Sequence, residues 1–385
     1  MYVNVTSSSL DQLAVVQLIN LAEGLNGILQ AQADEATLSP VAGFCATAIV
    51  RGVGLECEEI ASMESLKEWL SKTFRAIKNK IDDAFDKLKI SFIGLVDSAK
   101  KQSKELDLAV KRYERVKDNV PDKDTVAVGK GLWALLLRNR VPKDLAGEFK
   151  RMAGHIPDSD AMDVFIKSLL DGRVGKKLLD GYATNNTSKA ISDIHNLAEA
   201  TQEAVEHKLL AQAKPVRQSD TTIDRKVEGK LVATDFLLGN WRVVFELPKD
   251  KKALGSTLWA TENDSSVDSK AQDDLEVPLL SAETVSDTHR AIKDLFGIAS
   301  DVDKMLIDYS IGYAKLTEAA NMVGKAASRQ GQPKEWFDAY NDLMTYQFDV
   351  MNMMGRLYIV TMERAINSAK AFTQYVNATT KALEK

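Results

Sequence analysis

The strongest pattern in the chain is a run of apolar residues at helical spacing that begins just after Ser65. Placed on an α-helix, its members fall within an arc of about 100°. They are Leu66, Leu70, Phe74, Ile77, Ile81, Phe85, Leu88 and Phe92. Similar spacing continues past Gly94, where a kink is expected, to about Asn119, and Pro121 ends it. Residues 65–120 are therefore predicted to form one long amphipathic helix.

Two shorter helices are predicted ahead of this pattern. Apolar residues at helical spacing indicate one over 10–30, and a second over 40–51 has proline in its first turn. The connection over 52–61 contains two glycines and three glutamates, which is typical of an exposed segment. Residues 1–64 are therefore expected to form a separate helical leader.

The middle region, 121–260, mixes helical and strand patterns. After an apolar segment at 129–140, helices are predicted over 142–153, 159–170 and 188–213. Residues 227–234 and 241–247 are rich in β-formers and flank a turn around Leu238, Gly239 and Asn240. This arrangement predicts a β-hairpin, to which 257–260 would add a strand.

An acidic, weakly apolar stretch follows the hairpin. Residues 261–276 hold six acids and one lysine, so a solvated linker is expected over 261–282. Beyond it, helical spacing to about Arg329, a turn at Gly331 to Pro333 and a long helix over 336–382 predict a C-terminal α-hairpin, 283–385. We expect this hairpin to pack back on the helix over 65–119. The fold class predicted is mainly α, an elongated helical bundle with a small β-hairpin subdomain in the middle.

Composition narrows the class of protein. The chain of 385 residues is 45% hydrophobic and 27% charged, enough to bury a substantial core. Its two cysteines, Cys45 and Cys57, lack the neighbours of a zinc site and indicate no disulfide framework. We find no apolar run of the roughly 18 residues that span a bilayer, nor the basic start of a secretory signal.

The net charge is divided unevenly along the chain. Residues 1–64 hold eight acids and one base, a balance of 1 − 8 = −7. The remaining residues hold 50 − 1 = 49 bases and 55 − 8 = 47 acids, or +2. Loss of the leader would therefore change the sign of the protein's charge.

Enzyme signatures are not found in the sequence. The four histidines, His155, His195, His207 and His289, are scattered, and neither a phosphate-binding glycine loop nor a nucleophile elbow occurs. We therefore expect no catalytic residue, metal, cofactor or small-molecule substrate. An enzyme with an unfamiliar site in the middle region remains as an alternative, which a deep polar pocket there would favour.

Two helix faces have both a structural and a functional interpretation. The methionines of the last helix, Met344, Met351, Met353, Met354 and Met362, suit core filling, or else an adaptable binding face. The helix from Ser65 has a basic face made by Lys67, Lys72, Arg75, Lys78, Lys80, Lys87 and Lys89. Because four acids are interleaved with it, a solvated outer face is favoured over contact with nucleic acid phosphates or an anionic membrane.

A short motif stands where the acidic connection meets the long helix. Ser62, Met63 and Glu64 form a small-x-Glu sequence followed by Ser65, so a protease that cuts after Glu64 would release the leader without breaking packed structure. The motif recurs as Ser103, Lys104, Glu105, inside a predicted helix, and as Ser281, Ala282, Glu283, after the acidic linker. The last is a second candidate cleavage site.

With its leader, acidic connection and the stretch ASMESLKEWLSKTFRAIKNKIDDAFDKLK, the chain resembles internal head proteins of large tailed bacteriophages, mainly over residues 10–95. The resemblance implies a propeptide removed by the prohead protease after small-x-Glu, here at Ser62, Met63 and Glu64, leaving Ser65 first. It implies a structural protein of the capsid interior, assembled in the host cytoplasm with other head core or capsid proteins. Weak non-specific contact with packaged DNA and ejection with the genome are also expected.

The alternative is a helical adaptor that binds a membrane surface or a partner through the helix from Ser65.

Overall fold

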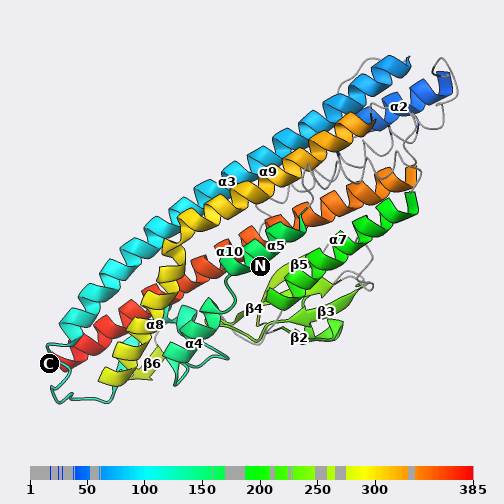
Figure 1. Ribbon diagram of the computed structural model, residues 1–385. Coiled ribbons are helices and arrows are strands. Elements are labelled where there is room, and N and C mark those ends of the chain that lie inside the picture. The colour runs from blue at the N-terminus through cyan, green and yellow to red at the C-terminus, as the bar shows by residue number, and fades with distance from the viewer. Residues whose placement is uncertain are drawn as a thin grey trace.

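The protein is an elongated, mainly α-helical molecule with small antiparallel sheets on one side (Figure 1). The computed structural model describes residues 40–52, 60, 62–157, 159–169, 187–208, 213–223, 227, 229–247, 258–264, 275–327 and 334–384, with single positions at Leu18, Leu25, Ile28 and Leu38. The predicted fold class is confirmed.

Helix α3, Met63–Tyr113, is the long amphipathic helix expected from the apolar pattern. Leu66, Ile77 and Phe92 are fully buried on its inner side. The helix assignment continues through Gly94 but ends at Tyr113, before the predicted end at Asn119. The end of the helix is tied to distant segments, because the hydroxyl of Tyr113 donates a hydrogen bond to the carbonyl of Leu280 (3.0 Å) and the side-chain amide of Asn119 donates one to the carbonyl of Leu383 (2.9 Å).

The C-terminal helices are α8, Ala282–Ser300, α9, Val302–Ala327, and α10, Lys334–Leu383. The single helix expected before the turn is broken at Asp301, which caps α8. Helices α3, α9 and α10 run side by side along the molecule (Figure 1). Helix α10 lies between the pair α3 and α9 on one side and the middle region on the other. The prediction that the C-terminal hairpin packs on α3 is confirmed.

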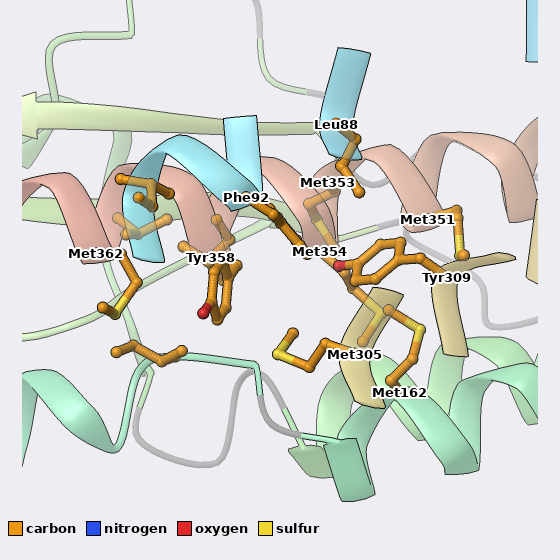
Figure 2. Packing of buried hydrophobic residues seen from close by; sticks show 14 of the residues in the cluster. Leu88, Phe92, Met162, Met305, Tyr309, Met351, Met353, Met354, Tyr358 and Met362 are labelled. Carbon is orange, nitrogen blue, oxygen red and sulfur yellow. The ribbon is translucent and has the colours of Figure 1, made fainter. Parts of the chain in front are cut away.

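Aromatic and methionine side chains fill the centre of this bundle. The ring of Phe92 lies 5.4 Å from that of Tyr309 and 4.6 Å from that of Tyr358, measured between centroids. Figure 2 shows methionines from α10 and α9 packed around these rings. All five methionines named above on α10 are buried, so core filling is the interpretation that the structure supports.

Three polar side chains tie α10 to two helices of the middle region. These helices are α5, Ser159–Ser168, and α7, Thr187–Lys208. The amide of Gln347 donates to the carbonyl of Ser168 (2.8 Å) and to the hydroxyl of Thr201 (3.0 Å), which in turn donates to the hydroxyl of Ser168 (3.2 Å). Because all three residues are buried, these bonds fix how α5 and α7 seat on α10.

A four-stranded antiparallel sheet forms the β subdomain, in the order β2-β3-β4-β5. The strands are β2, Lys214–Pro215, β3, Lys230–Ala233, β4, Trp241–Leu247, and β5, Leu258–Asn263. The predicted hairpin is the β3–β4 pair, with Val232 opposite Phe245. Its turn contains Gly239 and Asn240, both with positive φ (83° and 55°), as a tight turn requires.

A second sheet joins segments far apart in sequence. Strand β1, Thr125–Val128, pairs antiparallel with β6, Leu275–Pro278, and Val277 is buried. The predicted linker, 261–282, is therefore wrong at both ends, because β5 extends to Asn263 and β6 precedes α8. Residues 265–274 of that linker lie outside the described residues.

The remaining middle elements are short. A 3₁₀ helix, η1, Lys130–Leu135, replaces the apolar segment at 129–140, and α4 spans Leu145–Ala153 with Asp144 as its N-cap. A second 3₁₀ turn, η2, covers Gln218–Asp220. Asp144 accepts the N–H of Gly147 (2.7 Å), which is why α4 begins after residue 142, where the pattern placed it.

Part of the leader belongs to the core. Helix α2, Pro40–Gly52, is close to the prediction, while the helix expected over 10–30 lies outside the described residues apart from three positions. Buried leader side chains in the main hydrophobic cluster are Leu18, Leu25, Leu38, Ala46, Val50 and Ile60. The expectation that the leader stands apart from packed structure is therefore wrong, because its apolar face needs the bundle to cover it.

Candidate cleavage junction and basic surfaces

The residues just before the candidate cleavage site are held against α2. The N–H of Ile60 donates to the hydroxyl of Thr47 (2.8 Å), which itself donates to the carbonyl of Gly43 (2.9 Å). A Cβ on Gly43 would lie 2.3 Å from the carbonyl oxygen of Ile60, so only glycine permits this approach. The chain is thus anchored two residues before Ser62.

The candidate cleavage motif forms the N-terminal cap of α3. Ser62 is the N-cap, and its hydroxyl accepts the N–H of Ser65 (3.1 Å) while the Ser65 hydroxyl oxygen accepts the N–H of Ser62 (3.1 Å). Glu64 lies in the first turn and is exposed, as is Ser62. The Glu64–Ser65 bond is therefore accessible but helical, and a protease must unwind one turn to bind it extended.

The second candidate, Ser281, Ala282 and Glu283, has the same geometry. Ser281 caps α8, accepts the N–H of Thr284 (3.1 Å), and has Glu283 in the first turn. Serine followed two residues later by glutamate is thus a capping signature at both places, since the acid favours the positive end of the helix dipole. The third occurrence, at Ser103, lies inside α3 as predicted.

Removing the cap should expose the junction. We expect Ser62→Ala to destabilise the first turn of α3 by about 1 kcal/mol and so to raise the rate of cutting after Glu64 roughly fivefold. The matched control is Ser281→Ala, which removes the equivalent cap from α8 and should leave that rate unchanged. A glutamate-specific protease with mass spectrometry of the new N-termini measures both, and equal rates in the two variants would contradict the expectation.

The predicted basic face lies on the outer side of α3. Lys72, Arg75, Lys87 and Lys89 are exposed, whereas Lys67, Lys78 and Lys80 are half-buried. Lys72 pairs with Glu68 (3.0 Å) and covers the Trp69 ring at 5.2 Å. The charges on this face are thus partly balanced from within the helix.

A second basic surface, which the sequence did not reveal, is a cavity in the middle region. The cavity has a volume of about 880 Å³ and lies between the β sheet, the turn after η1, and α4. Its lining side chains include five cations and one carboxylate: Arg138, Arg140, Arg151, Lys214, Arg242 and Asp235. We call this the arginine cavity.

Three of these cations have carboxylate partners. Arg151 pairs with Glu148, Lys214 with Asp235 (2.8 Å), and Arg242 with Glu262 (2.8 Å). The hydrogen bond from Lys214 holds the pKa of Asp235 below its ordinary value. Among the described residues, the side chains of Arg138 and Arg140 have no such ion pair and are exposed. Net positive charge at the cavity therefore comes from these two arginines.

Two tight turns hold Arg138 and Arg140 in place. Arg138 and Asn139 have positive φ (51° and 65°) between the bridged residues Leu137 and Arg140, which is the geometry of a two-residue hairpin. The N–H of Arg138 donates to the side chain of Asn240, and the N–H of Gly239 donates to the carbonyl of Leu136 (2.9 Å). The turn after η1 is thus locked to the β-hairpin turn.

The histidines do not form a shared site in the described part of the chain. His155 is buried beside Arg151, and His289 binds Asp107 (2.7 Å), joining α8 to α3. His195 is half-buried on α7, and the side chain of His207 lies outside the description. Within the described residues, no group of three His, Cys, Asp or Glu side chains is placed to hold a metal ion, and no helix is long and apolar enough to cross a membrane.

The described residues thus form an elongated helical bundle with two basic surfaces. The model of one family, the phiKZ-like phage internal head proteins, matches residues 24–385, so the chain belongs to that family. The match extends the resemblance beyond the N-terminal quarter to nearly the whole chain, and it places the protein inside the phage head. Neither curated proteins nor solved structures gave a match.

Proposed function

We propose that the protein is made as a precursor, packaged inside the head with the genome, and cut after Glu64 by the prohead protease during maturation. The observation that carries this proposal is the junction itself. A small-x-Glu motif with exposed Ser62 and Glu64 stands where a segment of charge −7 meets a body of charge +2. In this role the protein meets other head core or capsid proteins, contacts DNA weakly, and leaves the head with the genome.

The charge step gives the cut a physical consequence. Before it, the acidic leader lowers the attraction of the chain for a polyanion, and afterwards the body carries a small positive charge. Dissociation of the leader after this cut would also remove its buried side chains, such as Val50 and Ile60, from the core cluster. The mature protein would then expose apolar surface at the leader end of the bundle for contact with other head proteins.

The N-terminal residue in purified heads tests this proposal. We expect Ser65 to be the first residue, with peptides from 1–60 depleted relative to the body. A Glu64→Gln variant supplied during infection should keep its leader, because the motif requires glutamate, whereas Glu283→Gln serves as the matched control and should be cut at Ser65 as usual. Peptides from the leader at the same abundance as those from the body would refute precursor processing.

A further inference from the structure

We propose that the arginine cavity binds the phosphodiester backbone of DNA. It is lined by the side chains of Arg138, Arg140, Arg151, Lys214 and Arg242, of which Arg138 and Arg140 are exposed and have no ion pair among the described residues. The proposal rests on the proposed packaging with the genome for the identity of the polyanion, while the site itself rests on the geometry of the described residues.

The charge of the cavity favours an anion. With the three carboxylates that pair with its cations included, the count is five positive against three negative charges. The excess of two belongs to Arg138 and Arg140. Because neither guanidinium group is neutralised by a carboxylate among the described residues, a bound anion would supply the missing counter-charge.

The cation type favours phosphate. Four of the five are arginines, whose planar fork binds two oxygens of one phosphate, which a lysine ammonium does not do. Arg242 also stacks over the ring of Phe236 (4.8 Å) and binds Glu262, so its position in the wall is fixed. The Nε of Arg151 is buried without a hydrogen-bond partner in the described structure.

The site is preorganised by backbone and not by long side chains alone. Hydrogen bonds to Asn240 and from Gly239 hold the Arg138–Asn139 turn against the turn of the β-hairpin. The backbone positions of both arginines are therefore fixed by the sheet. Less conformational entropy is lost on binding when the backbone is already ordered. Because both side chains are exposed, a continuous strand can contact them without entering the cavity whole.

The experiment compares two double variants of the full chain with equal charge change. Arg138→Gln with Arg140→Gln alters the cavity, and Arg75→Gln with Lys89→Gln alters the basic face of α3. Binding to a fluorescent DNA duplex is titrated at salt concentrations from about 50 to about 200 mM, a range over which counterion release changes the affinity measurably. The cavity variant should bind about tenfold or more weakly, with a salt slope lower by about two, and the α3 variant should change less.

Each other result overturns the assignment in its own way. Equal or larger losses in the α3 variant would place DNA on α3 and refute the cavity, with genome packaging intact. No binding by the wild-type protein, either as the full chain or after cutting behind Glu64, would refute DNA as the ligand, while the N-terminus found in purified heads separately decides precursor processing. Competition by polyglutamate as strong as by DNA would refute phosphate selectivity. Unchanged circular dichroism and thermal midpoint in both variants establish that folding is retained.

Discussion

Replacing Phe92 by alanine is expected to lower the free energy of unfolding by about 3–5 kcal/mol. The ring is fully buried between Tyr309 and Tyr358, at the level where α3, α9 and α10 meet. Its loss removes apolar contacts from three helices at once and leaves a cavity that rigid neighbouring rings fill poorly. Denaturant unfolding followed by circular dichroism measures the change.

The matched control is two residues away on the same helix. Ile90 is 72% exposed, so Ile90→Ala removes few contacts and should cost less than about 0.5 kcal/mol. Both variants shorten a side chain to alanine on the same helix, and both lie at nearly the same distance from the ends of α3. If Phe92→Ala cost no more than Ile90→Ala, the packing of α3 on α9 and α10 would be wrong.

Acidification is expected to destabilise the middle region through His155. Burial, with a smaller contribution from the charge of Arg151, lowers the pKa of this histidine from 6.5 to about 4, although Asp235 acts in the opposite direction. Between these two values the unfolded chain binds a proton that the folded protein does not. Stability is therefore complete above about pH 6.5 and falls by about 3 kcal/mol as the pH drops to 4.

His155→Gln removes this titration while keeping a polar side chain. Its unfolding free energy, compared with that of the wild type at pH 7.5, gives the cost of altered packing alone. The difference between the two proteins should then shrink, by up to about 3 kcal/mol, as the pH is lowered to 4. A constant difference across that range would show that His155 titrates alike in the folded and unfolded chains.

The helical spacing of apolar residues in the sequence was enough to predict the positions of the long helices α3 and α10. The apolar stripe that starts at Leu66 located α3 within a few residues at its start, and the spacing from Trp336 onward located α10. These patterns are local, because each turn of helix repeats the same requirement for an apolar inner face. The break at Asp301 was missed because apolar spacing continues across it from α8 to α9.

Features made by distant segments were not predictable in this way. Strand β1 is four residues long and pairs with β6, which lies about 150 residues later in the sequence. No connecting turn or alternating pattern in the sequence therefore indicates that these two strands pair. The arginine cavity likewise combines residues near 140, 151, 214 and 242. Its only local signal was the polar tip of the segment at 129–140, where Arg138 and Arg140 flank Asn139.

The small-x-Glu motif caps two helices, and the same pattern is compatible with the proposed cleavage. Ser62 and Ser281 were singled out as positions beside a scissile bond, and both cap helices. A serine at the N-cap and an acid in the first turn both stabilise the start of a helix, so the same residue pattern suits a helix cap and a small-x-Glu cleavage motif. A helix start is also the part of a helix that frays most readily, which reconciles a capped serine with access for a protease.

The central position of α10 has a consequence for synthesis of the chain. This helix is buried along most of its described length and is synthesised well after α3. Between completion of α3 at Tyr113 and the start of α10 at Lys334, translation at ~5–20 residues per second takes on the order of ten to forty seconds. During that interval the apolar stripe of α3 lacks α10, one of the two long helices that cover it, so the growing chain exposes apolar surface until α10 is made.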